Sequence, residues 1–219
     1  FCNFKLVSVY AIYNQFFSYI EKLVTSIHNG LLFTLGQMFK TDREKFKEYF
    51  EVDESGYMLV IFAIYSVAGS FLLPMIRLYT DGIHDINYVD QRLLILFLLI
   101  NVLSSGKLPN YQVIIFAEHF RETKYRAIAE AVINIVLSII AIQFWGIYGG
   151  LMGTIAALLY RTNDVIFYAS HKLLNRSVWK TYKKWLMNAS VFLVLLIYTS
   201  RRQMIYESYI SLFLQAALW

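Results

Sequence analysis

The sequence is poor in cysteine, proline and charged residues. Its 219 residues include one cysteine and two prolines, and only 16% of them are charged. The lone Cys2 cannot form an internal disulfide, and there is no Cys-X-X-Cys pair or Cys/His group for a structural metal. A secreted disulfide scaffold is therefore excluded. Disordered and collagen-like chains are excluded too, because 58% of the residues are hydrophobic.

The hydrophobic content instead indicates a membrane protein. A soluble domain averages about half apolar and a quarter charged residues, whereas the mean hydropathy here is +0.50. Aromatic residues reach 17%, as expected where rings lie at the membrane–water boundary. Because the sequence starts at Phe1 and stops within an apolar run, we expect a piece of a longer membrane protein. We expect no signal peptide, because the N-terminus lacks a basic segment, a short apolar core and a small-residue cleavage site.

Long apolar stretches predict the spans, since a helix needs about 20 residues to cross the hydrocarbon core. The candidates are residues 6–39, 57–79, 93–117, 125–145, 147–170 and 185–200, with a truncated seventh at 204–219. The sequence thus predicts an all-α, polytopic transmembrane helix bundle of about six full spans, forming one domain over residues 1–219. The glycines of WGIYGG favour a turn at Gly146 and two spans in place of one.

Basic residues predict the orientation, because Lys and Arg concentrate in cytoplasmic loops. With a turn at Gly146, twelve of them fall on one side: Lys40, Arg43, Lys45, Lys47, Arg121, Lys124, Arg126, Lys172, Arg176, Lys180, Lys183 and Lys184. The opposite side holds five: Lys5, Arg77, Arg92, Arg201 and Arg202. We therefore expect residues 40–56, 118–124 and 171–184 to face the cytoplasm. The first of these segments also holds six acidic residues, which fits a solvated helical connector or a partner-docking loop.

Polar residues form a stripe along the first predicted span. They are spaced by three and four positions, which places them on one helical face: Asn14, Ser18, Glu21, Thr25 and His28, with Lys22 at the flank. Lipid does not tolerate such a face. The stripe predicts either an aqueous cavity or a polar seam between helices.

Three further charges lie within apolar segments. They are Lys107, Arg161 and Asp164, with Glu130 nearer a helix end. Arg161 and Asp164 are three residues apart and can neutralise each other, although Arg161 can also extend to the inner headgroups. Gly106 and Pro109 flank Lys107, which predicts an irregular turn beside a cation and suits an anionic ligand.

Enzyme motifs are absent from the sequence. The four histidines are scattered, and there is no HExxH, GxSxG or Walker loop. We expect no enzyme activity, no cofactor and no bound metal. Gly146, Gly149, Gly150 and Gly153 make two overlapping GxxxG spacings, which close helix packing explains.

Four segments of the sequence follow the pattern and order of helices in one superfamily of membrane proteins. Residues 7–39, VSVYAIYNQFFSYIEKLVTSIHNGLLFTLGQMF, look like the eighth helix, with Ser8 where Gly is common. KYRAIAEAVINIVLSIIAIQFWGIYGGLMGT, residues 124–154, resembles the eleventh helix, turn and twelfth helix. SGKLPNYQVIIFAEHFRETKYR is similar to the preceding helix and its basic loop. KLLNRSVWKTYKKWL, residues 172–186, is similar to the connector to the thirteenth helix. The chain thus resembles bacterial polysaccharide flippases of the multidrug, oligosaccharidyl-lipid and polysaccharide exporter superfamily.

The resemblance implies a C-terminal lobe that works with a missing N-terminal lobe. Such lobes rock about a central cavity and move polyprenyl diphosphate-linked oligosaccharide across the bacterial cytoplasmic membrane for cell-surface polysaccharide synthesis. The implied partners are this lipid-linked sugar, membrane lipids and a coupling ion, H⁺ or Na⁺, with Glu21 and Asp164 as candidate coupling acids; no nucleic acid is expected. A multidrug exporter of the same superfamily is the alternative, and a membrane-embedded polysaccharide polymerase or glycosyltransferase is the rival of another class.

Overall fold

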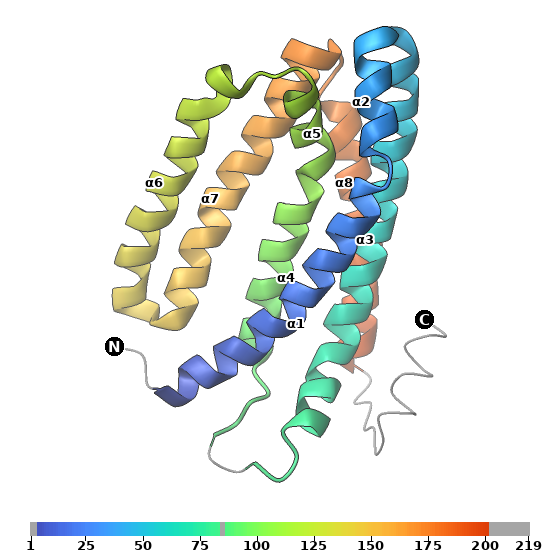
Figure 1. The fold of residues 1–219 in the computed structure, drawn as a ribbon. Helices are drawn as coiled ribbons and strands as arrows, with labels where there is room; N and C mark the ends of the chain where they lie inside the picture. The colour runs from blue at the N-terminus through green and yellow to red at the C-terminus, as the bar shows by residue number, and fades with distance from the viewer. Residues whose placement is uncertain (1–3, 84–85, 202–219) are drawn as a thin grey trace.

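The computed structural model describes residues 4–83 and 86–201, and every regular element in these ranges is helical. In chain order the elements are α1 (Phe4–Asn29), α2 (Leu32–Thr41), α3 (Arg43–Tyr79), α4 (Gln91–Gly106), α5 (Leu108–Phe116), α6 (Phe120–Trp145), α7 (Ile147–Tyr168), a π-helical turn η1 (Ala169–Leu174) and α8 (Trp179–Arg201). Neighbouring helices pack in the order α6, α7, α4, α3, α8. Figure 1 shows α1 crossing obliquely in front of α4.

Aromatic residues pack α1 against α4. Phe17 of α1 stacks on Phe97 of α4, with ring centroids 5.4 Å apart, and both side chains are buried. Tyr13 is buried one turn earlier, and its hydroxyl donates to the backbone oxygens of Tyr88 and Asp90. A buried tyrosine needs such a partner. The start of α1 is therefore tied to the N-terminus of α4.

Two of the predicted spans are divided in the structure. The range 6–39, expected as one helix, breaks at Gly30 and Leu31 into α1 and α2. The range 93–117 breaks at Lys107 into α4 and α5, as the flanking Gly106 and Pro109 predicted. Proline fits the first turn of a new helix because its missing N–H has no partner to lose there.

The helix α3 begins fourteen residues before the span predicted at 57–79. Asp42 caps it, because its side chain accepts a hydrogen bond from the backbone N–H of Lys45 at 3.0 Å. The acidic and basic connector at 40–56 is thus mostly the first part of α3. It is helical, as the connector interpretation expected.

The predicted turn at Gly146 is confirmed. Helix α6 ends at Trp145 and α7 begins at Ile147, with Gly146 at φ +56°. The two helices then pack backbone to backbone. A Cβ added at Gly149 would lie 2.2 Å from the Ala141 carbonyl oxygen, and one at Gly153 would lie 2.3 Å from Ser138 Oγ. These glycines serve close packing, as their spacing predicted.

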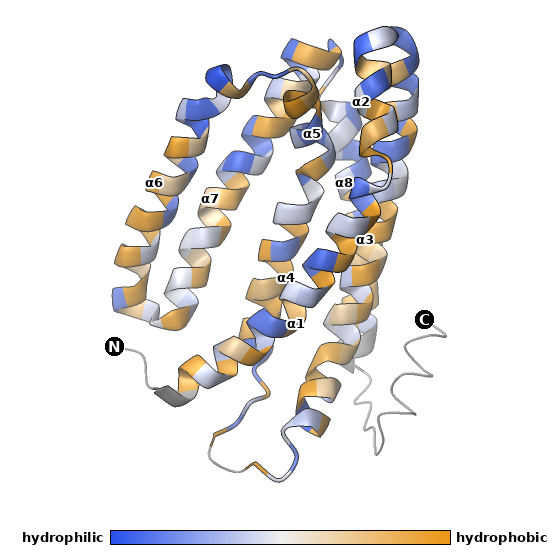
Figure 2. Cartoon of the chain, in the orientation of Figure 1, coloured by the Kyte–Doolittle hydropathy of each residue, from blue (hydrophilic) through white to orange (hydrophobic). Residues whose placement is uncertain are grey.

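Three of the described helices are long and apolar enough to cross a membrane. They are Arg43–Tyr79, Gln91–Phe116 (α4 and α5 together) and Phe120–Trp145. Figure 2 shows mostly hydrophobic turns along the lower half of α6, whereas hydrophilic turns gather where α2 meets α3. These properties are those of a helical membrane protein. The six full spans remain a prediction, and the range 204–219 lies outside the described residues.

The predicted orientation can be tested by labelling. Ser177 lies in the segment between η1 and α8, and Asn87 in the segment between α3 and α4. Figure 1 shows these two connecting segments at opposite ends of the bundle. Cysteines at these two positions, in a full-length protein whose Cys2 is replaced by serine, are expected to react with an impermeant thiol reagent from opposite sides. Labelling of both from the same side would contradict the orientation.

Candidate functional site

Five charged side chains from three parts of the chain form one network, here called the central charged cluster: Lys107, Arg126, Glu130, Arg161 and Asp164. Lys107 lies at the junction of α4 and α5, Arg126 and Glu130 lie on α6, and Arg161 and Asp164 lie on α7. The cluster therefore joins the α6–α7 pair to the break between α4 and α5.

Glu130 lies between two cations. Its Oε1 is 3.3 Å from Lys107 Nζ, and its Oε2 is 3.4 Å from Arg161 Nε. Both distances exceed the 2.7–2.9 Å typical of charge-assisted hydrogen bonds. Glu130 thus balances two charges without a short bond to either.

Asp164 is held more closely. It accepts from Arg161 Nη1 at 3.1 Å and makes a second ion pair with Arg126 Nη1. Arg161 also lies over the ring of Tyr111, and Arg126 over that of Tyr168. Three basic and two acidic side chains give the cluster a formal charge of +1.

The structure brings together the three predicted residues Lys107, Arg161 and Asp164. The pairing of Arg161 with Asp164 is confirmed, and the Arg161 side chain is only 5% exposed, so it is buried among helices. The prediction assigned Arg126 to a basic loop and gave Glu130 no role. Arg126 and Glu130 are four residues apart on one helix, so they lie on the same helical face. This spacing could have indicated that both residues belong to the site.

The stripe on α1 lies apart from this cluster. Asn14, Glu21 and Lys22 are exposed, Ser18 and Thr25 are half-buried, and His28 is buried. The His28 ring packs on Tyr57 of α3, with ring centroids 4.9 Å apart. Within the described residues, no hydrogen bond or ion pair links the stripe to the cluster. The cavity remains a prediction for this face.

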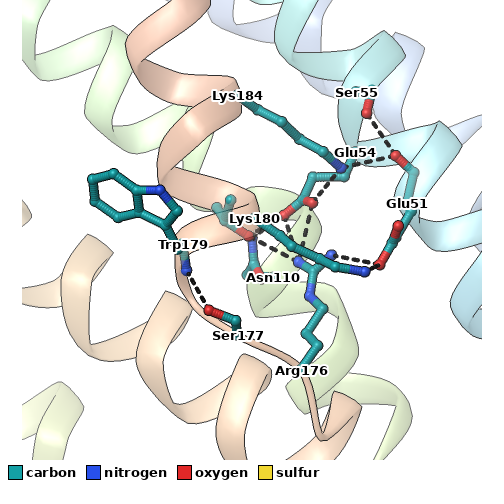
Figure 3. Close-up of polar contacts among 10 residues, drawn as sticks. Glu51, Glu54, Ser55, Asn110, Arg176, Ser177, Trp179, Lys180 and Lys184 are labelled. Carbon is teal, nitrogen blue, oxygen red and sulfur yellow. Dashed lines mark hydrogen bonds and ion pairs between the residues drawn. The ribbon is translucent and has the colours of Figure 1, made fainter.

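A second cluster, which the sequence did not indicate, surrounds the fully buried Glu54 of α3 (Figure 3). Its Oε1 accepts from Asn110 Nδ2 at 2.8 Å, Arg176 Nη2 at 2.9 Å and Thr181 Oγ1 at 2.8 Å. Its Oε2 accepts from Lys184 Nζ at 2.7 Å. This Glu54 cluster ties α3 to α5, to the segment before α8, and to α8 itself.

The two clusters differ in what they can do chemically. The fully buried Glu54 carboxylate accepts five hydrogen bonds of 2.7–3.0 Å, so its cluster holds helices together. The central charged cluster has a net positive charge, partial exposure and long contacts to Glu130, which suit an anion. Across residues 4–83 and 86–201, no group of three or more His, Cys, Asp or Glu side chains gathers that could hold a metal ion.

Comparison with known proteins adds no relative. No protein-family model matches the sequence, and no curated protein or solved structure matches it.

Proposed function

We propose that this chain is part of a flippase that moves polyprenyl diphosphate-linked oligosaccharide across the bacterial cytoplasmic membrane by alternating access. The sequence resemblance supports this function. The observation that carries it is the central charged cluster, a net cationic group among apolar helices. Charged residues within membrane helices are costly, and they ordinarily mark a substrate or ion pathway.

The chemistry of the substrate fits the cluster. A lipid diphosphate is anionic, and Lys107 lies where the helix ends and α5 begins, with its side chain 17% exposed. Arg161 behind it is buried and fixed by Asp164. A charge-assisted contact to a phosphate in such a partly desolvated place contributes about 1.5–3 kcal/mol.

The charge of the cluster and the length of one loop favour the flippase over the two alternatives. An exporter of organic cations needs an acidic cavity, whereas this cluster carries a net positive charge. A polymerase or glycosyltransferase of the expected type carries its catalytic groups on a large external loop. The connection between α3 and α4 spans only residues 80–90, which is too short to form one.

Replacement of Lys107 tests the proposal. In the full-length protein, Lys107→Gln is expected to lower export roughly tenfold or more, because the phosphate loses a cation worth about 1.5–3 kcal/mol. Lys107→Arg should retain part of the activity, because the charge is kept. The measurement is surface polysaccharide at matched membrane levels of each variant. Lys172→Gln is the control, since Lys172 is an exposed cation beyond α7. Normal export by Lys107→Gln would refute the proposal.

A further inference from the structure

Glu130 occupies the place where an anionic group would meet both cations of the central charged cluster. Its two carboxylate oxygens point separately at Lys107 and Arg161, at 3.3 Å and 3.4 Å. A diphosphate presents oxygens in the same way. The carboxylate and the ligand headgroup therefore compete for one position.

The Glu130 carboxylate is more exposed than the Asp164 carboxylate. The Glu130 side chain is 25% exposed and Lys107 is 17% exposed, but Asp164 and Arg161 are 12% and 5% exposed. An approaching anion reaches Glu130 and Lys107 before it reaches Arg161.

Hydrogen bonds divide the two acids in the same way. Asp164 accepts one from Arg126 and one from Arg161, so it orients the guanidinium. Glu130 accepts one from Lys107, and its contact with Arg161 Nε, at 3.4 Å, is an ion pair without a hydrogen bond. Less interaction energy is lost when Glu130 moves away than when Asp164 does.

We infer that Glu130 is a displaceable counter-ion that holds the binding position of the substrate diphosphate between Lys107 and Arg161 and expels the headgroup when it returns. This inference rests on the proposed function and adds a residue that controls both binding and release. Without the ligand, Glu130 is the counter-ion of Lys107 and Arg161. With the ligand bound, Glu130 turns to the open side and the phosphate oxygens replace it.

The test uses the purified full-length protein and two probes, farnesyl diphosphate and inorganic pyrophosphate, with titration calorimetry. Glu130→Gln is expected to lower the Kd about tenfold, about 1.4 kcal/mol, for both probes, because the headgroup no longer displaces a charge. The same variant should export more slowly than wild type, because nothing expels the bound headgroup. Tighter binding with slower export is the expected result.

Asp164→Asn is the matched control, because it removes the same charge from the same cluster. It should not tighten binding, since Asp164 orients Arg161 and does not occupy the ligand position. Equal tightening by both variants would show a general charge effect and overturn the inference, as would an unchanged Kd in Glu130→Gln. If wild type binds neither probe and Lys107→Gln exports normally, the proposed function itself fails and takes this inference with it.

Discussion

Glu54→Gln is expected to destabilise the protein by roughly 3–5 kcal/mol, because it removes one partner from a buried charge cluster. Gln keeps the shape of the side chain but removes the close counter-charge of two cations, Arg176 at 8% exposure and Lys184 at 18%, and leaves Arg176 only its 4.0 Å contact with Glu51. For a chain of this size the loss corresponds to a fall in apparent Tm of roughly 6–20 °C. The fall in apparent Tm is measured by thermal unfolding of the detergent-solubilised protein, with size-exclusion chromatography as the readout.

Glu51→Gln is the matched control, one turn earlier on α3. Glu51 pairs with Lys180 at 2.6 Å, but these side chains are 40% and 54% exposed, and its second contact, with Arg176, is as long as 4.0 Å. An exposed ion pair contributes at most about 1 kcal/mol, so the apparent Tm should hardly change. Similar losses for the two variants would show that burial of Glu54 does not govern its contribution.

Gly149→Ala is expected to cost about 3 kcal/mol, because its methyl group would lie 2.2 Å from the Ala141 carbonyl oxygen. The neighbour is backbone, so it cannot rotate away, and α6 must separate from α7. That movement also shifts Glu130 on α6 relative to Arg161 on α7. Thermal unfolding should therefore show a lower apparent Tm, and export should fall with it.

Gly150→Ala is the control for this substitution. A Cβ at Gly150 would meet only the Ile142 side chain, at 3.5 Å, which is ordinary contact. Replacing a helical glycine with alanine then gains roughly 0.5–1 kcal/mol through lower chain entropy. If Gly149→Ala proved as stable as Gly150→Ala, the close approach of α6 and α7 would be wrong.

Local features were predictable from the sequence. The turn at Gly146 follows from a run of glycines, the break at Lys107 from its flanking Gly106 and Pro109, and the Arg161–Asp164 pair from a spacing of three. Each depends on residues within one or two helical turns. The break after Asn29 has a local cause too, since Asn-Gly is a turn dipeptide, but the apolar residues on both sides favoured one long helix.

Long-range features were not predictable in this way. Asn110 lies 56 residues from Glu54, and Lys184 lies 130 residues from it. The sequence pattern of α3 indicates an acidic helical connector, but it does not indicate which cations pack against that connector. Only the packing of α3 against α5 and α8 determines that Glu54 is buried and Glu51 is not.

The distance along the chain between Glu54 and its cations has a consequence for biosynthesis. Arg176 is made 122 residues after Glu54, which at about 5–20 residues per second means a delay of about 6–24 s. During that interval the carboxylate has no cationic partner from this cluster, although Asn110 is made 56 residues after it, so we expect the early part of α3 to stay at the aqueous surface. The insertion depth of α3 is therefore fixed late, when the ribosome has delivered the segment that leads into α8.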